Sequence, residues 1–321
     1  MKQVIRAIAA AGLCALAIGV HAQAYPAKPI RVVLPFPPGS GTDTTARPVL
    51  NQMSRQMGQP IIVDNRPGAG GTIGMAAVAA ADPDGYTVLV HSNSFTVVPA
   101  TYTKLPFDTA RDFVGVMPIA ALPMALVTSP TKGYQALKDL IAAGKARPGS
   151  INYASAGAGG ATHLGAERFR LAAGFEGAHV PYKGSAEALT DVITARVDYY
   201  FSPVGLALPQ IMAGKLAALA VSSSTRSSAM PNVPTTLESG LPNSEYNVWV
   251  GMMAHAKTPR AVLQRLNDEM VKAIQSSEVQ DTFKKLVAEP MIMSLDQFDA
   301  MLKREYSMNA ALVKAAGVTV N

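Results

Sequence analysis

One local pattern occurs twice in this 321-residue chain: a predicted buried strand, then a glycine-rich loop, then a helix start. The first copy spans residues 30–43 and contains Gly39-Ser40-Gly41-Thr42-Asp43. The second spans residues 151–163 and contains Gly157-Ala158-Gly159-Gly160. Such a loop leaves unpaired backbone N–H groups at a helix N-terminus, where the helix dipole adds partial positive charge. Each copy is a candidate anion site, and two sites far apart in sequence indicate a two-lobed receptor that closes on a small acid.

The N-terminus has the composition of a secretory signal peptide. Lys2 and Arg6 precede an apolar stretch over residues 7–20, and Ala22-Gln23-Ala24 is a small-x-small cleavage site. We expect cleavage before Tyr25 and export to the periplasm, with retention as a membrane anchor as the alternative. The single cysteine, Cys14, lies in this segment, so the mature chain is expected to have no disulfide or thiolate ligand.

The composition argues against a nucleic-acid partner. Removing Lys2 and Arg6 lowers the formal net charge from +6 to +4, the basic residues form no run of four, and aromatic residues make up 6% of the chain. Nucleic-acid surfaces cluster basic and aromatic side chains. About 300 residues without disulfides build a core most readily as two domains.

Apolar runs alternate with helical periodicity along the chain. The first unit has predicted strands at 30–34, 60–63 and 86–91, and the second at 125–128, 151–155, 179–181, 197–201 and 216–222. This β-α-β order implies parallel sheets covered by helices on both faces. Two amphipathic helices then follow a strand at 249–255. One is predicted to start with Thr258 as N-cap and Pro259 at the first helical position, the other with the capping box Ser294-x-x-Gln297.

The tail helices need a surface against which to bury their apolar faces, so we expect them to pack on the first unit. This makes the first lobe discontinuous. The predicted division is residues 1–24 as signal peptide, 25–126 and 247–321 as lobe 1, and 127–246 as lobe 2. Two strands would cross between the lobes, near 120–128 and 246–254.

Each candidate motif has a structural alternative. The first glycine loop either holds a carboxylate or is a tight turn with Thr42 or Asp43 as N-cap. In the second loop, Ser155 and Thr162 offer hydroxyls to a ligand, or Thr162 caps the helix and His163 is structural. Tyr182-Lys183-Gly184-Ser185 either borders the cleft or is an ordinary turn.

Catalytic and cofactor motifs are absent from the sequence. Thr44 stands where G-x-G-x-x-G needs glycine, and no P-loop, G-x-S-x-G or H-E-x-x-H string occurs. The histidines after residue 24 are isolated, without metal-ligand spacing. We expect the protein to bind no cofactor or metal and not to be an enzyme. A dispersed Ser/His/Asp triad remains an alternative, because a triad is defined by geometry and not by sequence spacing.

Several longer strings carry a family resemblance. They are Tyr25-Pro26-x-Lys28-Pro29-Ile30-Arg31, Pro35-Phe36-x-Pro38-Gly39-x-Gly41-Thr42-Asp43, Val63-Asp64-Asn65-Arg66-Pro67-Gly68-Ala69-Gly70-Gly71, Tyr102-x-Lys104-Leu105-Pro106-Phe107-Asp108 and His179-Val180-Pro181-Tyr182-Lys183-Gly184. The chain resembles the Bug (TctC-like) receptors of tripartite tricarboxylate transporters over essentially its whole mature length.

The resemblance implies a type II periplasmic binding protein fold of class α/β, with two doubly wound lobes around a central cleft joined by two crossover strands. It implies a monomeric receptor that captures a small organic carboxylate, a di- or tricarboxylate or an aromatic acid, and delivers it to permease subunits in the membrane. The alternatives are a receptor that reports to a sensor kinase and an exported hydrolase. The expected ligand-binding residues are Pro35, Phe36, Pro37, Gly39, Ser40, Gly41, Thr42, Asp43, Ser92, Asn93, Ser155, Ala156, Gly157, Gly159, Thr162, His163, Tyr182 and Ser202.

The sequence departs from the family pattern at two places. Ser40 stands where the family usually has glycine, which puts a side chain in the first loop. Ser202 stands where many members have an aspartate that would favour a ligand amino group. Its loss favours a plain or aromatic acid over an amino acid.

Overall fold

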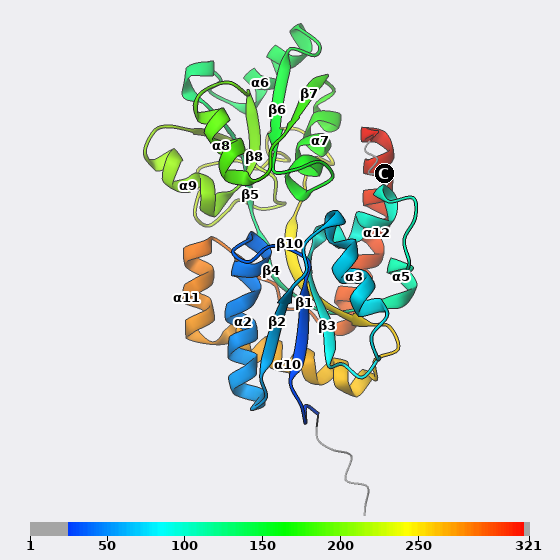
Figure 1. Ribbon diagram of the computed structural model, residues 1–321. Coiled ribbons are helices and arrows are strands. Elements are labelled where there is room, and N and C mark those ends of the chain that lie inside the picture. The colour runs from blue at the N-terminus through cyan, green and yellow to red at the C-terminus, as the bar shows by residue number, and fades with distance from the viewer. Residues whose placement is uncertain (1–24, 318–321) are drawn as a thin grey trace, which may run out of the picture.

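The computed structural model describes residues 25–317, which form two α/β lobes stacked one above the other (Figure 1). The predicted signal peptide lies outside the described residues. Lobe 1 is built on a six-stranded sheet in which β1, β2 and β3 are parallel and β10 is antiparallel to both β3 and β4. In spatial order its strands are β11 (Glu289–Pro290), β4 (Phe113–Leu122), β10 (Val248–His255), β3 (Thr87–Ser92), β1 (Ile30–Leu34) and β2 (Ile61–Asn65).

Lobe 2 is built on a five-stranded sheet. β6 is parallel to β7 and β8, whereas β5 is antiparallel to β8 and β9. In spatial order its strands are β7 (Gly177–Pro181), β6 (Ile151–Ser155), β8 (Tyr199–Pro203), β5 (Met124–Thr128) and β9 (Ala217–Val221).

Helices cover both sheets. In lobe 1 these are α2 (Gly41–Met57), α3 (Thr72–Ala79), α4 (Val98–Thr101), α5 (Thr109–Asp112), α10 (Arg260–Gln275), α11 (Ser277–Leu286) and the start of α12 (Leu295–Ala316). In lobe 2 they are α6 (Leu137–Ala146), α7 (Ala161–Ala173), α8 (Ser185–Ile193) and α9 (Val204–Met212). Short 3-10 helices are η1 (Ala69–Gly71), η2 (Asn93–Thr96) and η3 (Pro130–Lys132).

The predicted α/β alternation is confirmed, and several helix ends differ from prediction. The capping box of Ser294 and Gln297 is present. Helix α10 begins one residue later than predicted, because Pro259 occupies the N-cap position rather than the first helical one. Both predicted tail helices are present, but a third helix, α11, lies between them and was not predicted. It starts after Ser276, where extended backbone interrupts the helix without a glycine or proline.

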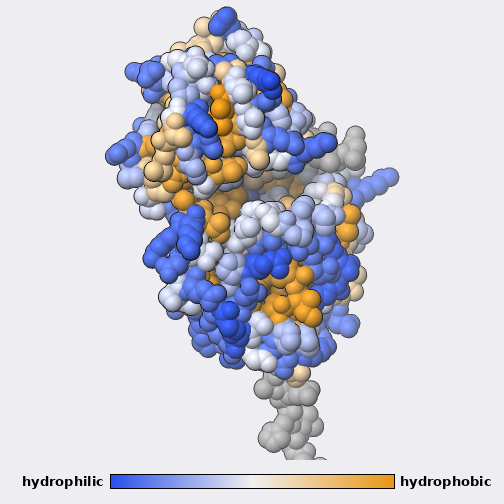
Figure 2. Space-filling view, turned by 60° about the vertical axis from the view of Figure 1, so that its left-hand side comes forward, coloured by the Kyte–Doolittle hydropathy of each residue, from blue (hydrophilic) through white to orange (hydrophobic). Residues whose placement is uncertain are grey.

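Strand pairing fixes the direction in which each glycine loop points. β10 enters lobe 1 from lobe 2, β3 is antiparallel to β10, and β1 is parallel to β3, so β1 runs toward lobe 2. Likewise β5 runs into lobe 2, β8 is antiparallel to it, and β6 is parallel to β8, so β6 runs toward lobe 1. The loops after β1 and β6 therefore both end at the junction of the lobes. The surface is indented at this junction, with apolar side chains in the hollow (Figure 2).

Helix α12 contacts both lobes. Near its start Phe298 packs edge-on against Trp249 in the core of lobe 1, while Leu312 and Val313 near its end belong to the core cluster of lobe 2. Figure 1 shows α12 rising beside the junction toward α7. Within residues 25–317 we find no helix with the length and apolar character needed to span a membrane.

Candidate functional site

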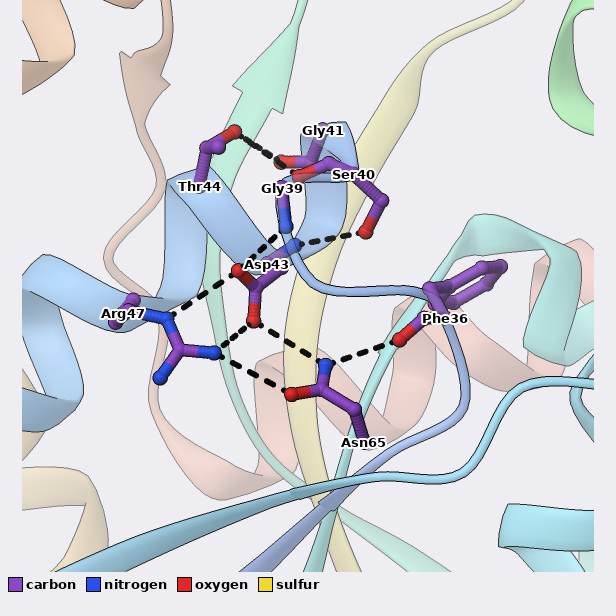
Figure 3. A network of polar contacts seen from close by, with 8 residues as sticks. All are labelled: Phe36, Gly39, Ser40, Gly41, Asp43, Thr44, Arg47 and Asn65. Atoms are coloured by element: carbon purple, nitrogen blue, oxygen red, sulfur yellow. Dashed lines mark hydrogen bonds and ion pairs between the residues drawn. The ribbon is translucent and has the colours of Figure 1, made fainter. Parts of the chain in front are cut away.

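The loop between β1 and α2 is closed by the carboxylate of Asp43. Its Oδ2 accepts the N–H of Gly39 at 3.0 Å and Nε of Arg47 at 3.2 Å, and its Oδ1 accepts Nδ2 of Asn65 at 3.3 Å (Figure 3). Burial alone would raise the pKa of Asp43, but the hydrogen bonds from Arg47, Gly39 and Asn65 outweigh it and hold that pKa below its ordinary value. Asp43 thus braces the loop, and Arg47 compensates its charge.

The N-cap of α2 is neither Thr42 nor Asp43. Ser40 has extended backbone dihedrals, and its Oγ accepts the N–H of Asp43 at 3.3 Å, which is the usual N-cap geometry for serine. The side chain of Ser40 therefore stabilises the helix start. Within the described residues, the N–H groups of Gly41 and Thr42 have no hydrogen-bond partner, and these are the donors left at this helix end.

The loop between β6 and α7 is tied by its own side chains. Oγ1 of Thr162 accepts the N–H of Ala156 at 2.8 Å, Oγ of Ser155 accepts that of Gly157 at 3.2 Å, and Nδ1 of His163 accepts that of Gly159 at 3.0 Å. Three predicted loop donors are thus used internally. The left-handed φ values of Gly157 and Gly159, +131° and +73°, explain why glycine stands at both positions.

The first turn of α7 keeps free donors. Its N-cap is Gly160, not Thr162, and it offers no side-chain cap. In the part of the chain that the structure describes, the N–H groups of Ala161, Thr162 and His163 have no acceptor. Both glycine loops therefore lead to helix N-termini with unpaired amides at the junction, which is the arrangement that binds anions.

His163 has a structural role in the loop. Its ring stacks on that of His179 with centroids 3.7 Å apart. Burial, followed by the neighbouring His179, lowers the pKa of His163 to about 4. A neutral imidazole is required, because a protonated Nδ1 could not accept the Gly159 N–H.

Four other predicted ligand-binding residues make contacts within the protein. Tyr182 donates its hydroxyl to Asp191 at 2.8 Å. Ser202 is fully buried and donates to the carbonyl of Pro203 at 3.2 Å. Phe36, between Pro35 and Pro37, meets His91 edge-on at 5.0 Å. Ser92 caps η2 by accepting the N–H of Ser94.

Asn93 is turned toward the second crossover segment, the chain around residues 246–254 that leads from lobe 2 into β10. It is 2% exposed, and its Nδ2 donates to the hydroxyl of Tyr246 at 3.0 Å and to the carbonyl of Asn247 at 3.3 Å. A cavity of about 420 Å³ lies at this junction, and Asn93 is the one predicted ligand residue among those that line it. The structure therefore places Asn93 between the end of β3 and the segment that joins the lobes.

Sequence reasoning missed two residues that brace the first loop. Arg47 lies one helical turn after Asp43, a spacing that predicts an ion pair, and Asn65 ends β2. Asn65 links the loop to its neighbouring strand by donating to both Phe36 O, at 2.9 Å, and Asp43. Its signal was present in the family string from Val63 to Gly71.

The geometry offers little support for a Ser/His/Asp triad. Oγ of Ser155 lies 2.6 Å from Nε2 of His179, but Ser155 is fully buried. Within residues 25–317, no carboxylate hydrogen-bonds to His179, and no group of three or more potential metal ligands occurs.

Two α/β lobes, two crossover strands and a helix N-terminus from each lobe at their junction define a periplasmic binding protein, a class of solute receptors and not of enzymes. A family model described as "Tripartite tricarboxylate transporter family receptor" matches residues 45–318. The chain belongs to this family, the TctC or Bug family.

Relatives with similar sequences span nearly the whole chain. Protein BugT of Bordetella pertussis is 37% identical over 312 residues, covering 97% of this chain and 95% of BugT. The UPF0065 protein in the tcbD-tcbE intergenic region of Pseudomonas sp. (strain P51) is 38% identical over 286 residues, covering 89% and 85%.

Solved structures share the fold. A periplasmic transporter is 36% identical with a TM-score of 0.81, covering 93% of this chain and 100% of that one. Rpa4515 of R. palustris, solved with adipate, is 29% identical with a TM-score of 0.80, covering 92% and 99%. MatC of Rhodopseudomonas palustris, solved with malate, is 28% identical with a TM-score of 0.77, covering 90% and 100%. The predicted family and fold are confirmed, the protein is a periplasmic solute receptor, and cleavage before Tyr25 stays a prediction.

Proposed function

We propose that this receptor captures a small aliphatic dicarboxylate between its lobes and delivers it to the membrane subunits of a tripartite tricarboxylate-type permease. The observation that carries the proposal is the pair of helix N-termini, one in each lobe, whose free first-turn amides lie at the junction. Adipate and malate, the ligands of two structural neighbours, are both dicarboxylates.

Capture follows from the two-lobed construction. The amides of Gly41 and Thr42 in lobe 1, and of Ala161 to His163 in lobe 2, would each attract carboxylate oxygens. An acid that contacts both lobes favours the arrangement in which the two loops are close, because only there does it reach both sets of donors.

The ligand is expected to lack an amino group. A buried aspartate at position 202 would supply an acceptor for ammonium, and this chain has Ser202, whose hydroxyl donates to Pro203 O. An ammonium group would then lose its water without gaining a charged partner, which is costly.

A thermal-shift panel on refolded, ligand-free protein tests the proposal. The panel holds adipate, malate, citrate, benzoate, aspartate and glutamate. A ligand at 100 times its dissociation constant stabilises the fold by about 2.7 kcal/mol, which raises the melting temperature. We expect this for adipate and malate, the dicarboxylates without an amino group, and not for aspartate or glutamate; selective binding of glutamate or aspartate would refute the predicted ligand class.

The variant Gly41→Asp tests whether the acid binds at the N-terminus of α2. A side chain at this exposed glycine meets nothing within 4 Å, and an acidic residue in the first turn stabilises a helix. The added carboxylate should therefore abolish binding of the acid without lowering the unfolding temperature. Gly41→Asn is the uncharged control of nearly equal size and should bind more tightly than Gly41→Asp. Equal binding by the two variants would show that the acid lies elsewhere.

Crosslinking of the acid-loaded receptor distinguishes a permease partner from a sensor kinase. A permease partner predicts that acid-loaded receptor crosslinks to permease subunits in membrane fractions, whereas a sensing role predicts crosslinks to the outer domain of a kinase. Crosslinks to the kinase alone would replace the delivery proposal and leave the ligand proposal intact.

A further inference from the structure

A buried polar cluster joins α12 to β10 and η2. Both carboxylate oxygens of Glu305 accept Nε1–H of Trp249, at 2.8 and 3.0 Å, and Oε2 lies 3.1 Å from Oγ1 of Thr96. Nδ2 of Asn309 donates to the same Thr96 oxygen at 2.8 Å. Thr96 is fully buried, so each of its hydrogen bonds matters to the stability of the cluster.

The cluster continues into the segment that joins the lobes. Oγ1 of Thr96 lies 2.8 Å from the carbonyl oxygen of Asn93, and the side chain of Asn93 donates to Tyr246 and Asn247. Tyr246 is tied in turn to lobe 2, since its N–H and carbonyl bond to Ser222. A path of polar contacts, continued through Asn93 itself, thus runs from Glu305 to the second crossover segment.

The single proton of the Thr96 hydroxyl couples the two ends of this path. Protonated Glu305 can donate to Thr96, leaving the Thr96 proton for the carbonyl of Asn93. Ionised Glu305 can only accept, so it competes with Asn93 for that proton. The two protonation states therefore require different hydrogen-bond patterns at Asn93.

We propose that Glu305 is a positioning residue for lobe closure, whose protonation holds Asn93 and the second crossover segment in place through Thr96 and whose ionisation loosens them. The proposal concerns regulation and rests on the proposed function only for the role of closure in capture. The cavity of about 420 Å³ beside Glu305 has walls from both lobes, including Arg168 of α7 and Arg304 of α12, so lobe movement changes the surroundings of the carboxyl.

The ionisation of Glu305 falls near neutral pH. Burial raises the pKa of Glu305 to about 7, and the hydrogen bonds from Trp249 and Thr96, together with the charge of Arg304, oppose this rise only in part. The other charged or titratable groups at the cavity are Arg168 on α7, Glu245 and Tyr246 before β10, and Glu289 on β11.

Fluorescence of Trp249, the only tryptophan in the sequence, tests the ionisation. Its indole N–H is bonded to the titrating carboxyl, so we expect an emission change with a midpoint near pH 7 in the full chain. Glu305→Gln keeps a bonding side chain without the charge and should abolish the change, while His255→Gln should retain it. A flat wild-type titration between pH 6 and 8 would overturn the proposal.

Interlobe distance tests the coupling. Cys14→Ser removes the only cysteine, so the exposed Lys104 of lobe 1 and Lys145 of lobe 2 can be replaced by cysteine and spin-labelled. We expect the distance distribution to change between pH 6 and 8 in this background, but not with Glu305→Gln added.

Thr96→Val tests whether the carboxyl group of Glu305 acts on the lobes through Thr96 or has only a structural role. It should keep the Trp249 titration and lose the pH response of the distance, and Thr96→Ser should restore that response. A pH response that survives Glu305→Gln or Thr96→Val, or a titration without any distance change, would refute the coupling. No ligand is used, so failure here is distinct from failure of the acid panel.

Discussion

The carboxylate of Asp43 accepts the N–H of Gly39 at 3.0 Å and so closes the loop that precedes α2. The same carboxylate is paired with Arg47 and bonded to Asn65. The negative charge of Asp43, which lies beside the predicted anion site, is thereby compensated by Arg47. The loop is therefore held in place before a ligand binds. A preformed site of this kind costs less ordering on binding than a flexible one.

Asp43→Ala is expected to destabilise the fold by about 2 kcal/mol, because the Gly39 amide, Asn65 and Arg47 lose their common acceptor. Urea unfolding measures the loss. Asp281→Ala, which removes an exposed ion pair with Lys284 beyond the first turn of α11, is the control and should leave the unfolding midpoint nearly unchanged. Equal effects of the two substitutions would contradict the bracing role of Asp43.

Local patterns in the sequence were sufficient to predict the two glycine loops and most strands. Each loop is one contiguous string, and Gly39, Gly157 and Gly159 all have positive φ, as such strings suggest. Family strings covering the whole chain then indicated the two-lobed arrangement, which periodicity alone does not specify.

The sequence did not reveal which loop amides stay free. That depends on side chains returning from the next helical turn, as Asp43 and His163 do, and on Asn65 from another strand. The partner of Asn93 was equally hidden, since Tyr246 lies 153 positions away. The cap at Ser40 had a local signal, because serine is among the preferred N-cap residues, but Thr42 and Asp43 competed with it.

Gly71→Ala should cost about 3 kcal/mol of stability. Gly71 has φ +100°, and an added Cβ would lie 2.3 Å from Nε2 of His91, which is fully buried. Gly133→Ala shares the positive φ, +79°, but meets nothing within 4 Å, so it should cost only about 1 kcal/mol. Denaturant unfolding of the two variants separates contact from backbone strain; equal losses would show that the His91 contact is unimportant.

Acidification should destabilise the fold partly through His163. Its pKa falls to about 4 in the folded state, so between pH 6.5 and 4 the unfolded chain binds the proton more readily. The stability contributed by neutral His163 is complete above pH 6.5 and is lost as the pH falls toward 4, by about 3 kcal/mol. Buried His91, whose pKa is also lowered to about 4, adds a loss in the same direction.

Unfolding free energies of His163→Gln and wild type at pH 7 and pH 4.5 test this prediction. The glutamine oxygen can still accept from Gly159, so the variant should fold and show a smaller loss on acidification. His255→Gln is the matched control and should keep the wild-type loss. Identical pH dependence in His163→Gln and wild type would contradict the assignment of a neutral, loop-holding imidazole.

Gly205→Ala should change the spacing of the lobes. Gly205 lies in α9 of lobe 2, and an added Cβ would come within 2.6 Å of the carbonyl oxygen of Leu286, at the end of α11 in lobe 1. A backbone carbonyl cannot turn aside as a flexible side chain can, so the two helices must separate. The distance between spin labels at positions 104 and 145 should therefore lengthen, while amide exchange in the core strands of each lobe stays as in wild type. Leu206→Ala, at the neighbouring and partly exposed position of the same helix, should leave the distance unchanged. An unaltered distance in a folded Gly205→Ala variant would mean that the contact between α9 and α11 does not limit the approach of the lobes.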